Sequence, residues 1–495
     1  MTDPRTLTPR WPTAQLLVDG RSVSPEDGAV LTLTNPATGE RLPDAPAAGP
    51  RDVERAVQAA RRAFDQGPWP RMNATARGKK LRALADALWE RRDEFALVES
   101  LNNGKTFREA LSGDVAPGAA TLAYAGEWAN KILGEVVPVD GPFQTLVLRE
   151  PVGVVAAIVP WNYPTSLACW KLGPALAAGC TVVLKPSELT PFTAMKLGEL
   201  AREVGFPEGV VNVLPGYGEP AGEALARHPG VDKVAFTGSV RTARRLLHAS
   251  ADTNLKRLSL ELGGKSPQII LADADLPAAA DACFWGIFGS KGEVCSAGSR
   301  VVVQSSIYDE FVAQLAERAR RMRVGDPLDP QTQMGAQISA RQMETILGYV
   351  ASGRSEGARL VAGGERDREG PKVKGNFLQP TVFADVGPAM RIAQEEIFGP
   401  VLACLRVQDE AEALAVANGT RYGLGAAIWT RDVARAQALA RWLRSGVVWI
   451  NCFNEFDDAA PFGGVKESGW GRDLSHHALD NYLETKAVWT RLPEV

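Results

Sequence analysis

The sequence predicts an α/β protein of two or three domains, and three observations support this prediction. From residue 152 onward, short apolar runs rich in β-branched residues alternate with helical segments, which is typical of βαβ units around a buried parallel sheet. The chain has 495 residues, more than the roughly 250–300 that one hydrophobic core supports. Its hydrophobic and charged fractions, 45% and 23%, are those of an ordinary folded protein, so disorder is excluded.

The individual elements can be placed in order along the chain. Residues 51–68 and 74–101 each show the apolar period of an amphipathic helix. Strands of a first sheet are predicted, with helical segments between them, in VGVVAAIV (152–159), TVVLKP (181–186), GVVNVLPG (209–216), KVAFTGS (233–239) and KRLSLELGG (256–264). A second α/β stretch follows residue 264, with helices over 308–322 and near 339–353. Segments 143–152 and 481–489 alternate as strands do.

Charge and cysteine usage restrict the partners and the compartment. The formal charge of −3 and the pI near 6.0 give no net positive field, which disfavours nucleic acid and membrane surfaces as partners. Six cysteines without a Cys-x-x-Cys pair indicate reduced thiols and no metal site. The first residues lack the apolar core of a secretory signal, and no run reaches the roughly 18 apolar residues of a membrane span. We therefore expect a cytoplasmic protein.

Residues that follow the strands are candidate ligand contacts, because open parallel sheets bind ligands at the carboxyl ends of their strands. Gly218 belongs to a glycine-rich stretch that approaches a dinucleotide fingerprint, although the spacing also suits an ordinary turn. Lys185 and Glu188 can address ribose hydroxyls or a phosphate, or form a surface salt bridge. Gly238 and Ser239 open a helix whose N-terminus can hold a pyrophosphate, or Ser239 simply caps that helix.

Cys295 stands among small residues in KGEVCSAGSR, and none of the four histidines lies within the motifs. A free thiol has a pKa of about 8.5 and needs a nearby base or positive charge to become a nucleophile. Taken alone, the residue is better explained as an inert core cysteine.

Together the motifs resemble those of NAD(P)-dependent aldehyde dehydrogenases. PWNYP, KPSE, FTGS, LELGGKSP, GEVCSAGSR, EEIFGP and PFGGVKESGWGRD occur in the family's order and spacing, and the resemblance runs from LTNPATGE (33–40) to the last predicted strand. It implies membership of the hydrolytic, acid-forming branch. The implied fold has a Rossmann-like NAD domain (1–130 and 152–263), an α/β catalytic domain (264–462), and a β oligomerisation arm with a C-terminal segment (131–151 and 463–495). Such an arm implies a homodimer or homotetramer.

The resemblance also implies the catalytic roles. Cys295 corresponds to the nucleophile that attacks the aldehyde carbonyl and forms a thiohemiacetal. The Asn162 side chain and the Cys295 backbone N–H would hold the oxyanion. Glu261 corresponds to the carboxylate that activates water against the thioester, so the expected acyl acceptor is water and not coenzyme A.

The implied cofactor is NAD, with NADP less favoured. Lys185 and Glu188 resemble the residues that bind the adenosine ribose, and a carboxylate there would repel a 2′-phosphate. Glu396 and Phe398 match residues at the nicotinamide ribose and ring. The expected cofactor set is completed by Trp161, Gly218, Gly238 and Ser239.

Tyr163, Trp170 and Phe462 match positions along the family's substrate tunnel and imply a broad range of aliphatic and aromatic aldehydes. An alternative substrate is an aminoaldehyde or betaine aldehyde, held through cation–π attraction. An acidic segment could draw such a cation in, although a solvated loop is the simpler explanation of its residues: Glu455, Asp457 and Asp458. Two further rivals are a cysteine esterase or hydrolase without a redox role, and a scaffold without catalysis.

Four positions depart from the family pattern. Ala243 stands where a glycine is usual in the helix after TGS. Asp473 occupies the place of a glutamate that commonly serves as a proton relay. Lys291 and Glu293 stand where amides are common, and their spacing suggests a local ion pair.

Overall fold

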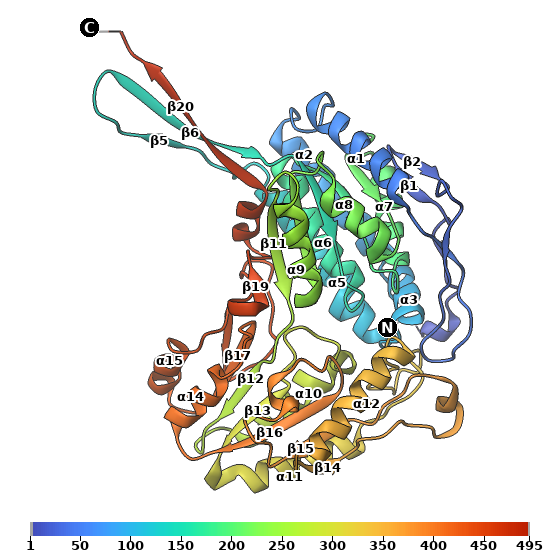
Figure 1. Cartoon of the computed structure of the whole chain (residues 1–495), viewed down its shortest axis with the longest axis vertical. Helices are drawn as coiled ribbons and strands as arrows, with labels where there is room; N and C mark the ends of the chain where they lie inside the picture. The colour runs from blue at the N-terminus through green and yellow to red at the C-terminus, as the bar shows by residue number, and fades with distance from the viewer. Residues whose placement is uncertain (1–2, 494–495) are drawn as a thin grey trace.

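The computed structural model describes residues 3–493 and contains two large β-sheets, each with its own layers of helices (Figure 1). The first sheet has eight strands, in the spatial order β19 (Gly469–Trp470), β11 (Arg257–Leu262), β10 (Lys233–Gly238), β7 (Val154–Ile158), β8 (Thr181–Lys185), β9 (Val211–Val213), β1 (Leu16–Val18) and β2 (Arg21–Val23). Its five central strands are parallel, and the strands on either side of them are antiparallel. The predicted α/β class is confirmed.

Both faces of the first sheet are buried, which is why its strands read as continuous apolar runs. Along β8, Val182 and Leu184 face one hydrophobic core, while Val183 faces the other. Helices that pack on the first face include α2 (Ala74–Glu90), α3 (Arg92–Asn103), α5 (Ala116–Trp128), α6 (Pro164–Ala178) and α7 (Phe192–Glu203). Those on the second face are α1 (Pro50–Asp65), α8 (Glu223–Arg227) and α9 (Val240–Ala251). A short helix α4 (Phe107–Ala110) follows α3.

The second sheet has seven strands, in the order β14 (Arg359–Ala362), β15 (Thr381–Ala384), β16 (Val401–Val407), β13 (Arg300–Gln304), β12 (Pro267–Ile270), β17 (Gly425–Trp429) and β18 (Val447–Ile450). It is covered by α10 (Leu276–Phe288), α11 (Tyr308–Arg321), α12 (Ala340–Ser355), α13 (Arg391–Gln394), α14 (Glu410–Asn418) and α15 (Val433–Ala440). Residues 263–266 connect β11 directly to β12, so the end of the first sheet adjoins the second.

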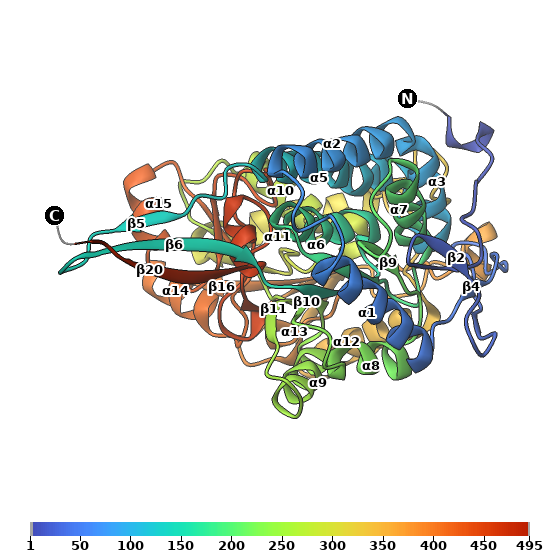
Figure 2. The same cartoon turned by 90° about the horizontal axis from the view of Figure 1, so that it is seen from above.

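A three-stranded arm projects from the body of the molecule (Figures 1 and 2). It consists of β5 (Glu135–Val137), β6 (Phe143–Pro151) and β20 (Leu483–Arg491), with β6 in the centre; a separate two-stranded sheet pairs β3 (Val30–Leu31) with β4 (Ala45–Pro46). Residues 463–482 precede the arm, and β19 within them pairs with β11 of the first sheet. The domain boundaries drawn from the sequence stay a prediction.

The predicted helix 74–101 is wrong in one respect, because it is two helices. Arg91 ends α2 and begins α3, with φ −99° and ψ 16°. Residues 90–93 are all charged. No apolar side chain in this stretch can be buried, so packing does not stabilise one continuous helix across it. Among residues 3–493, no helix combines the length and apolarity needed to cross a bilayer.

Candidate active site

A cavity of about 680 Å³ opens where the two sheets adjoin, and it contains most of the predicted site residues. Cys295, Glu261 and Asn162 all line it. So do five of the predicted cofactor residues: Trp161, Gly238, Ser239, Glu396 and Phe398. The carboxyl ends of β7, β10 and β11 therefore contribute residues to one cavity, as the rule for open parallel sheets predicts.

A second cavity, of about 430 Å³, is lined by Lys185 and Gly218, and Arg241 lines both cavities. Lys185 Nζ donates a hydrogen bond of 3.0 Å to the Pro186 carbonyl. Burial lowers the Lys185 pKa to about 8, against the opposing influence of the Glu188 carboxylate. Glu188 does not line either cavity. Its influence on this region is electrostatic, through its attraction to the Lys185 ammonium.

Cys295 lies between the short turn Gly289–Gly292 and β13, and its side chain is partly exposed. Burial, followed by the Glu396 and Glu261 carboxylates, raises the thiol pKa to about 12. Both charged groups that act on the thiol are carboxylates, so activation of Cys295 requires a base and not a neighbouring positive charge. The thiol is therefore protonated at neutral pH in the chain by itself.

Asn162 is buried just before α6, and its Nδ2 donates a 3.0 Å hydrogen bond to the Glu293 carbonyl. This bond fixes which end of the amide carries the donors. An amide nitrogen has two N–H groups, so the second one is available to an oxygen atom in the cavity.

Glu261 is buried at the end of β11, and within residues 3–493 neither of its carboxylate oxygens has a hydrogen-bond partner. Burial raises its pKa well above the ordinary value; Asp473 raises it further, whereas Lys171 and Arg472 lower it. Lys171 and Asp473 form an ion pair that is almost completely buried, with side-chain exposures of 0% and 3%. Glu261 thus presents to the cavity a carboxyl group without a hydrogen-bond partner among residues 3–493, and its raised pKa makes its ionised form a better base than an ordinary carboxylate.

Glu396 accepts a 3.1 Å hydrogen bond from the Gly264 backbone N–H, and burial raises its pKa to about 7. A Cβ atom at Gly263 would lie 2.0 Å from a Glu396 carboxylate oxygen, so the glycine there makes room for this side chain. The rings of Trp161 and Phe398 meet edge to face with centroids 5.1 Å apart.

Ser239 caps α9, because its Oγ accepts a 3.2 Å hydrogen bond from the Thr242 N–H. The structural alternative raised from the sequence is confirmed for this residue. Ser239 nevertheless lines the larger cavity, so capping does not remove the helix N-terminus from a ligand.

Aromatic side chains continue from Cys295 toward the surface. Trp170 and Phe462 meet edge to face at 5.4 Å and pack together with Cys295. The ring centroids of Phe456 and Phe462 are 5.4 Å apart, so Phe456 extends this wall. No motif in the sequence marks Phe456 as a site residue. Tyr163 lies against the Lys105 ammonium, 4.1 Å from the ring centroid.

The acidic segment is only partly free. Glu455 and Asp457 are exposed, whereas Asp458 is half-buried and accepts a 2.6 Å hydrogen bond from Thr121 Oγ1. Burial raises the Asp458 pKa above its usual range. This carboxylate is therefore engaged within the protein.

Two polar contacts at the site had no motif to signal them. Gln342, on α12, donates a 2.8 Å hydrogen bond from Nε2 to the Phe398 carbonyl. Asn103, at the end of α3, donates a 2.8 Å bond from Nδ2 to the Trp161 carbonyl. Within residues 3–493, no group of three or more His, Cys, Asp or Glu side chains is arranged to hold a metal ion.

The fold and the cavities define an α/β protein in which a thiol, an amide donor and a carboxyl group without a hydrogen-bond partner among residues 3–493 line one space, with a second cavity sharing Arg241. A family model described as the aldehyde dehydrogenase family matches residues 23–488. Retinal dehydrogenase 2 from Rattus norvegicus is 46% identical over 481 residues, which cover 97% of this chain and 92% of that protein.

Solved structures agree. The P. syringae AldA indole-3-acetaldehyde dehydrogenase, in complex with NAD+ and IAA, superposes with a TM-score of 0.96 at 45% identity, covering 99% of this chain and 98% of that one. The NAD+ complex of an aldehyde dehydrogenase from Bacillus cereus gives a TM-score of 0.95 at 43% identity and 97% coverage of both chains. The chain belongs to the aldehyde dehydrogenase family. It is an oxidoreductase that acts on aldehydes with a nicotinamide dinucleotide, and the family and fold expected from its motifs are confirmed.

Proposed function

We propose that this chain oxidises an aldehyde to the carboxylic acid with NAD, through a thioester on Cys295. The observation that carries the proposal is that Cys295, Asn162 and Glu261 line one cavity together with Glu396 and Phe398. A cysteine esterase would have no use for the second cavity at Lys185, and a scaffold would have no use for an unpaired buried carboxylate.

The residues present fit a dinucleotide. The cavities follow the carboxyl ends of β8, β10 and β11, and the N-terminus of α9 opens onto the larger one. Lys185 would hold the adenosine ribose, the α9 N-terminus with Ser239 the pyrophosphate, and Glu396 the nicotinamide ribose. When bound, NAD supplies the hydride acceptor.

Cys295 and Asn162 carry the first half of the reaction. Glu261, a stronger base than an ordinary carboxylate because of its burial, takes the thiol proton as Sγ bonds to the carbonyl carbon. The second N–H of Asn162 and the Cys295 backbone N–H receive the oxygen that becomes an oxyanion. A neutral amide suits this task, because a full positive charge would oppose the collapse that expels the C–H hydrogen as hydride.

Glu261 carries the second half. After hydride loss the C=O bond re-forms as a thioester on Cys295. Glu261 releases the thiol proton to solvent and then deprotonates a water molecule, whose oxygen adds to the thioester carbon. The C–S bond breaks, the thiol regains a proton, and the carboxylic acid leaves.

NAD is favoured over NADP because the Glu188 carboxylate acts on Lys185, in the region proposed for the adenosine ribose. A 2′-phosphate there would meet a negative charge.

The substrates are neutral aliphatic and aromatic aldehydes that pack against Trp170, Phe462 and Phe456. Two relatives are named for retinal and indole-3-acetaldehyde, which are neutral and apolar. The aminoaldehyde alternative is less supported, since Asp458 already accepts a bond from Thr121.

The exposed surface of the arm supports a homodimer or homotetramer. Val136, Phe143 and Trp489 expose 70%, 39% and 59% of their surface on its three strands, and a second copy of the chain would cover them. The six free cysteines suit the cytoplasm, where thiols stay reduced.

The function is tested by following NADH formation with hexanal, benzaldehyde, 4-aminobutanal and betaine aldehyde, each with NAD+ and with NADP+. Turnover of the neutral aldehydes with NAD+ and loss of all turnover in Cys295→Ala, with NAD+ binding retained, would support the proposal. Full turnover in Cys295→Ala would contradict it.

A further inference from the structure

Two charged residues in the turn before Cys295 are completely buried. Lys291 Nζ lies 2.8 Å from Glu293 Oε2, and the side chains are 0% and 1% exposed. Neither residue is among those that line the larger cavity, and the proposed reaction gives neither a chemical step. A buried ion pair is a costly feature, because both charges leave water.

Each partner of this pair has further anchors. Lys291 Nζ donates to the backbone carbonyl and to Oδ1 of Asn103, at 2.9 and 2.8 Å. Asn103 is the last residue of α3, so the ammonium lies at a helix C-terminus, where positive charge is favourable. Glu293 Oε1 accepts a 3.0 Å hydrogen bond from the Ile338 N–H. Burial lowers the pKa of Lys291 and raises that of Glu293, while each charge opposes the shift of the other.

These contacts close into a ring through the oxyanion amide. Asn162 Nδ2 donates to the Glu293 carbonyl at 3.0 Å, and Glu293 pairs with Lys291. Lys291 donates to Asn103, whose Nδ2 in turn donates to the Trp161 carbonyl at 2.8 Å. Trp161 directly precedes Asn162, so the ring of five residues is complete.

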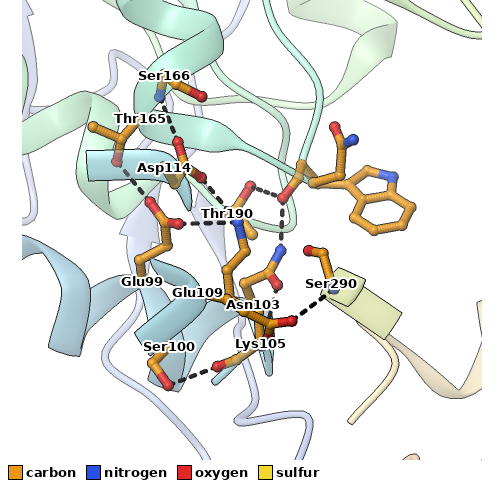
Figure 3. A network of polar contacts seen from close by, with 12 residues as sticks. Glu99, Ser100, Asn103, Lys105, Glu109, Asp114, Thr165, Ser166, Thr190 and Ser290 are labelled. Atoms are coloured by element: carbon orange, nitrogen blue, oxygen red, sulfur yellow. Dashed lines mark hydrogen bonds and ion pairs between the residues drawn. The ribbon is translucent and has the colours of Figure 1, made fainter. Parts of the chain in front are cut away.

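The turn itself has little freedom to compensate. The Ser290 N–H donates a 2.7 Å hydrogen bond to Glu109, a link that Figure 3 shows within the same polar network as Asn103. A Cβ atom at Gly292 would lie 2.3 Å from the backbone of Gly399. The turn is therefore held on both sides of Lys291, at Ser290 and at Gly292.

We infer that the Lys291–Glu293 ion pair positions Asn162, so that the N–H not bound to Glu293 points at the aldehyde oxygen. Lys291 and Glu293 are positioning residues, and the inference rests on the proposed function of Asn162. With one N–H fixed on the Glu293 carbonyl, the plane of the amide is set and the direction of the other N–H follows from it. A buried charge left without its partner would displace the Glu293 carbonyl.

The test compares Lys291→Gln, Glu293→Gln and the double variant, each measured for kcat, aldehyde KM and NAD+ affinity. Each single variant should lower kcat by about 10- to 100-fold, short of the roughly 10²–10³-fold cost of removing an oxyanion donor outright. NAD+ affinity should change by less than about threefold. The double variant, which holds two neutral amides, should recover kcat to within about threefold of the wild type.

A mutant cycle with Asn162→Ala separates positioning from general damage. If Lys291 acts through Asn162, Lys291→Gln in the Asn162→Ala background should lower kcat by less than about threefold. Lys196→Gln is the matched control, because it breaks the ion pair of Lys196 with Glu94, which lies outside the ring. That control should lower the melting temperature and leave kcat unchanged.

An equal kcat loss from Lys291→Gln in both backgrounds would overturn the positioning inference and leave the proposed function intact. A double variant as impaired as the worse single variant would also overturn it. Full kcat in Asn162→Ala would overturn the proposed role of Asn162, and the positioning inference with it. Because the double variant introduces no lone charge, it remains informative where a single variant fails to fold.

Discussion

A Cβ atom placed on Gly463 would lie 2.6 Å from Glu261 Oε1. Gly463, the first glycine of PFGGVKE, therefore leaves the space that the Glu261 carboxylate occupies. Glu261 has no hydrogen bond from any residue in 3–493 to hold it, so the space beside Gly463 is part of what defines its position.

We predict that Gly463→Ala displaces Glu261 and lowers kcat by about tenfold or more, since small misplacements of reacting groups cost up to about 10²-fold. Steady-state rates with a neutral aldehyde measure this effect. Gly348→Ala is the control, because a Cβ there meets no atom within 4 Å and Gly348 lies in α12, where alanine should be neutral or stabilising. Unchanged kcat in Gly463→Ala would show that Glu261 tolerates the added methyl group.

The buried pair of Lys171 and Asp473 should set the pH range of the reaction. Lys171 lowers the Glu261 pKa and Asp473 raises it. Lys171→Met should therefore move the acidic limb of the kcat–pH profile to higher pH, and Asp473→Asn should move it to lower pH. Both variants should also lose stability, by about 3–5 kcal/mol for a broken buried pair. Shifts in the same direction would contradict this assignment.

The Cys295 thiol should be slow to alkylate in the protein without cofactor. Its pKa near 12 means that the thiolate fraction, and hence the iodoacetamide rate, rises about tenfold per pH unit between pH 7 and 9. Glu396→Gln should speed alkylation, because it removes the larger of the two anionic influences on the thiol. Cys295→Ala supplies the background from the half-exposed Cys452. A pH-independent rate would refute the raised pKa.

Cofactor choice should depend on Glu188. Glu188→Gln should improve NADP+ use relative to NAD+, because the repulsion of a 2′-phosphate is removed. The Lys185 pKa near 8 predicts that NAD+ affinity falls as the pH rises through about 8. Glu188 raises that pKa, so the same variant should move the fall to lower pH. Isothermal titration at several pH values measures both effects, and an unchanged midpoint would contradict the link between these residues.

Assembly should depend on the arm. Trp489→Asp places a charge on exposed apolar surface beside Phe143, whose ring centroid lies 6.0 Å away. We expect light scattering to show dissociation of the oligomer. Trp442→Asp is the matched control, because Trp442 is 70% exposed at the end of α15, away from the arm. Equal masses for wild type and Trp489→Asp would argue against the arm as the interface.

Much of the fold could be predicted because local signals and burial agree. The strands β7, β8, β10 and β11 are short apolar runs buried on both faces, and each run ends in a motif. The break at Arg91 escaped prediction because the apolar period continues on either side of a charged tetrapeptide.

The supporting contacts could not be predicted, since folding alone brings them together. Asn103 reaches Trp161, 58 residues away, and Lys291, 188 residues away. Lys171 reaches Asp473 across 302 residues. Hydrophobic periodicity carries no information on such polar pairs. The raised Cys295 pKa likewise depends on burial and on carboxylates from other segments.

The most direct test of the central claim is mass spectrometry of Glu261→Gln quenched with acid after mixing with NAD+ and benzaldehyde. We expect NADH formation to be slowed, because Glu261 no longer takes the thiol proton, and to stop near one NADH per active site. The peptide that contains Cys295 should then carry a benzoyl group, because water is not activated to hydrolyse the thioester. NADH release without any acyl group on Cys295 would contradict the thioester route.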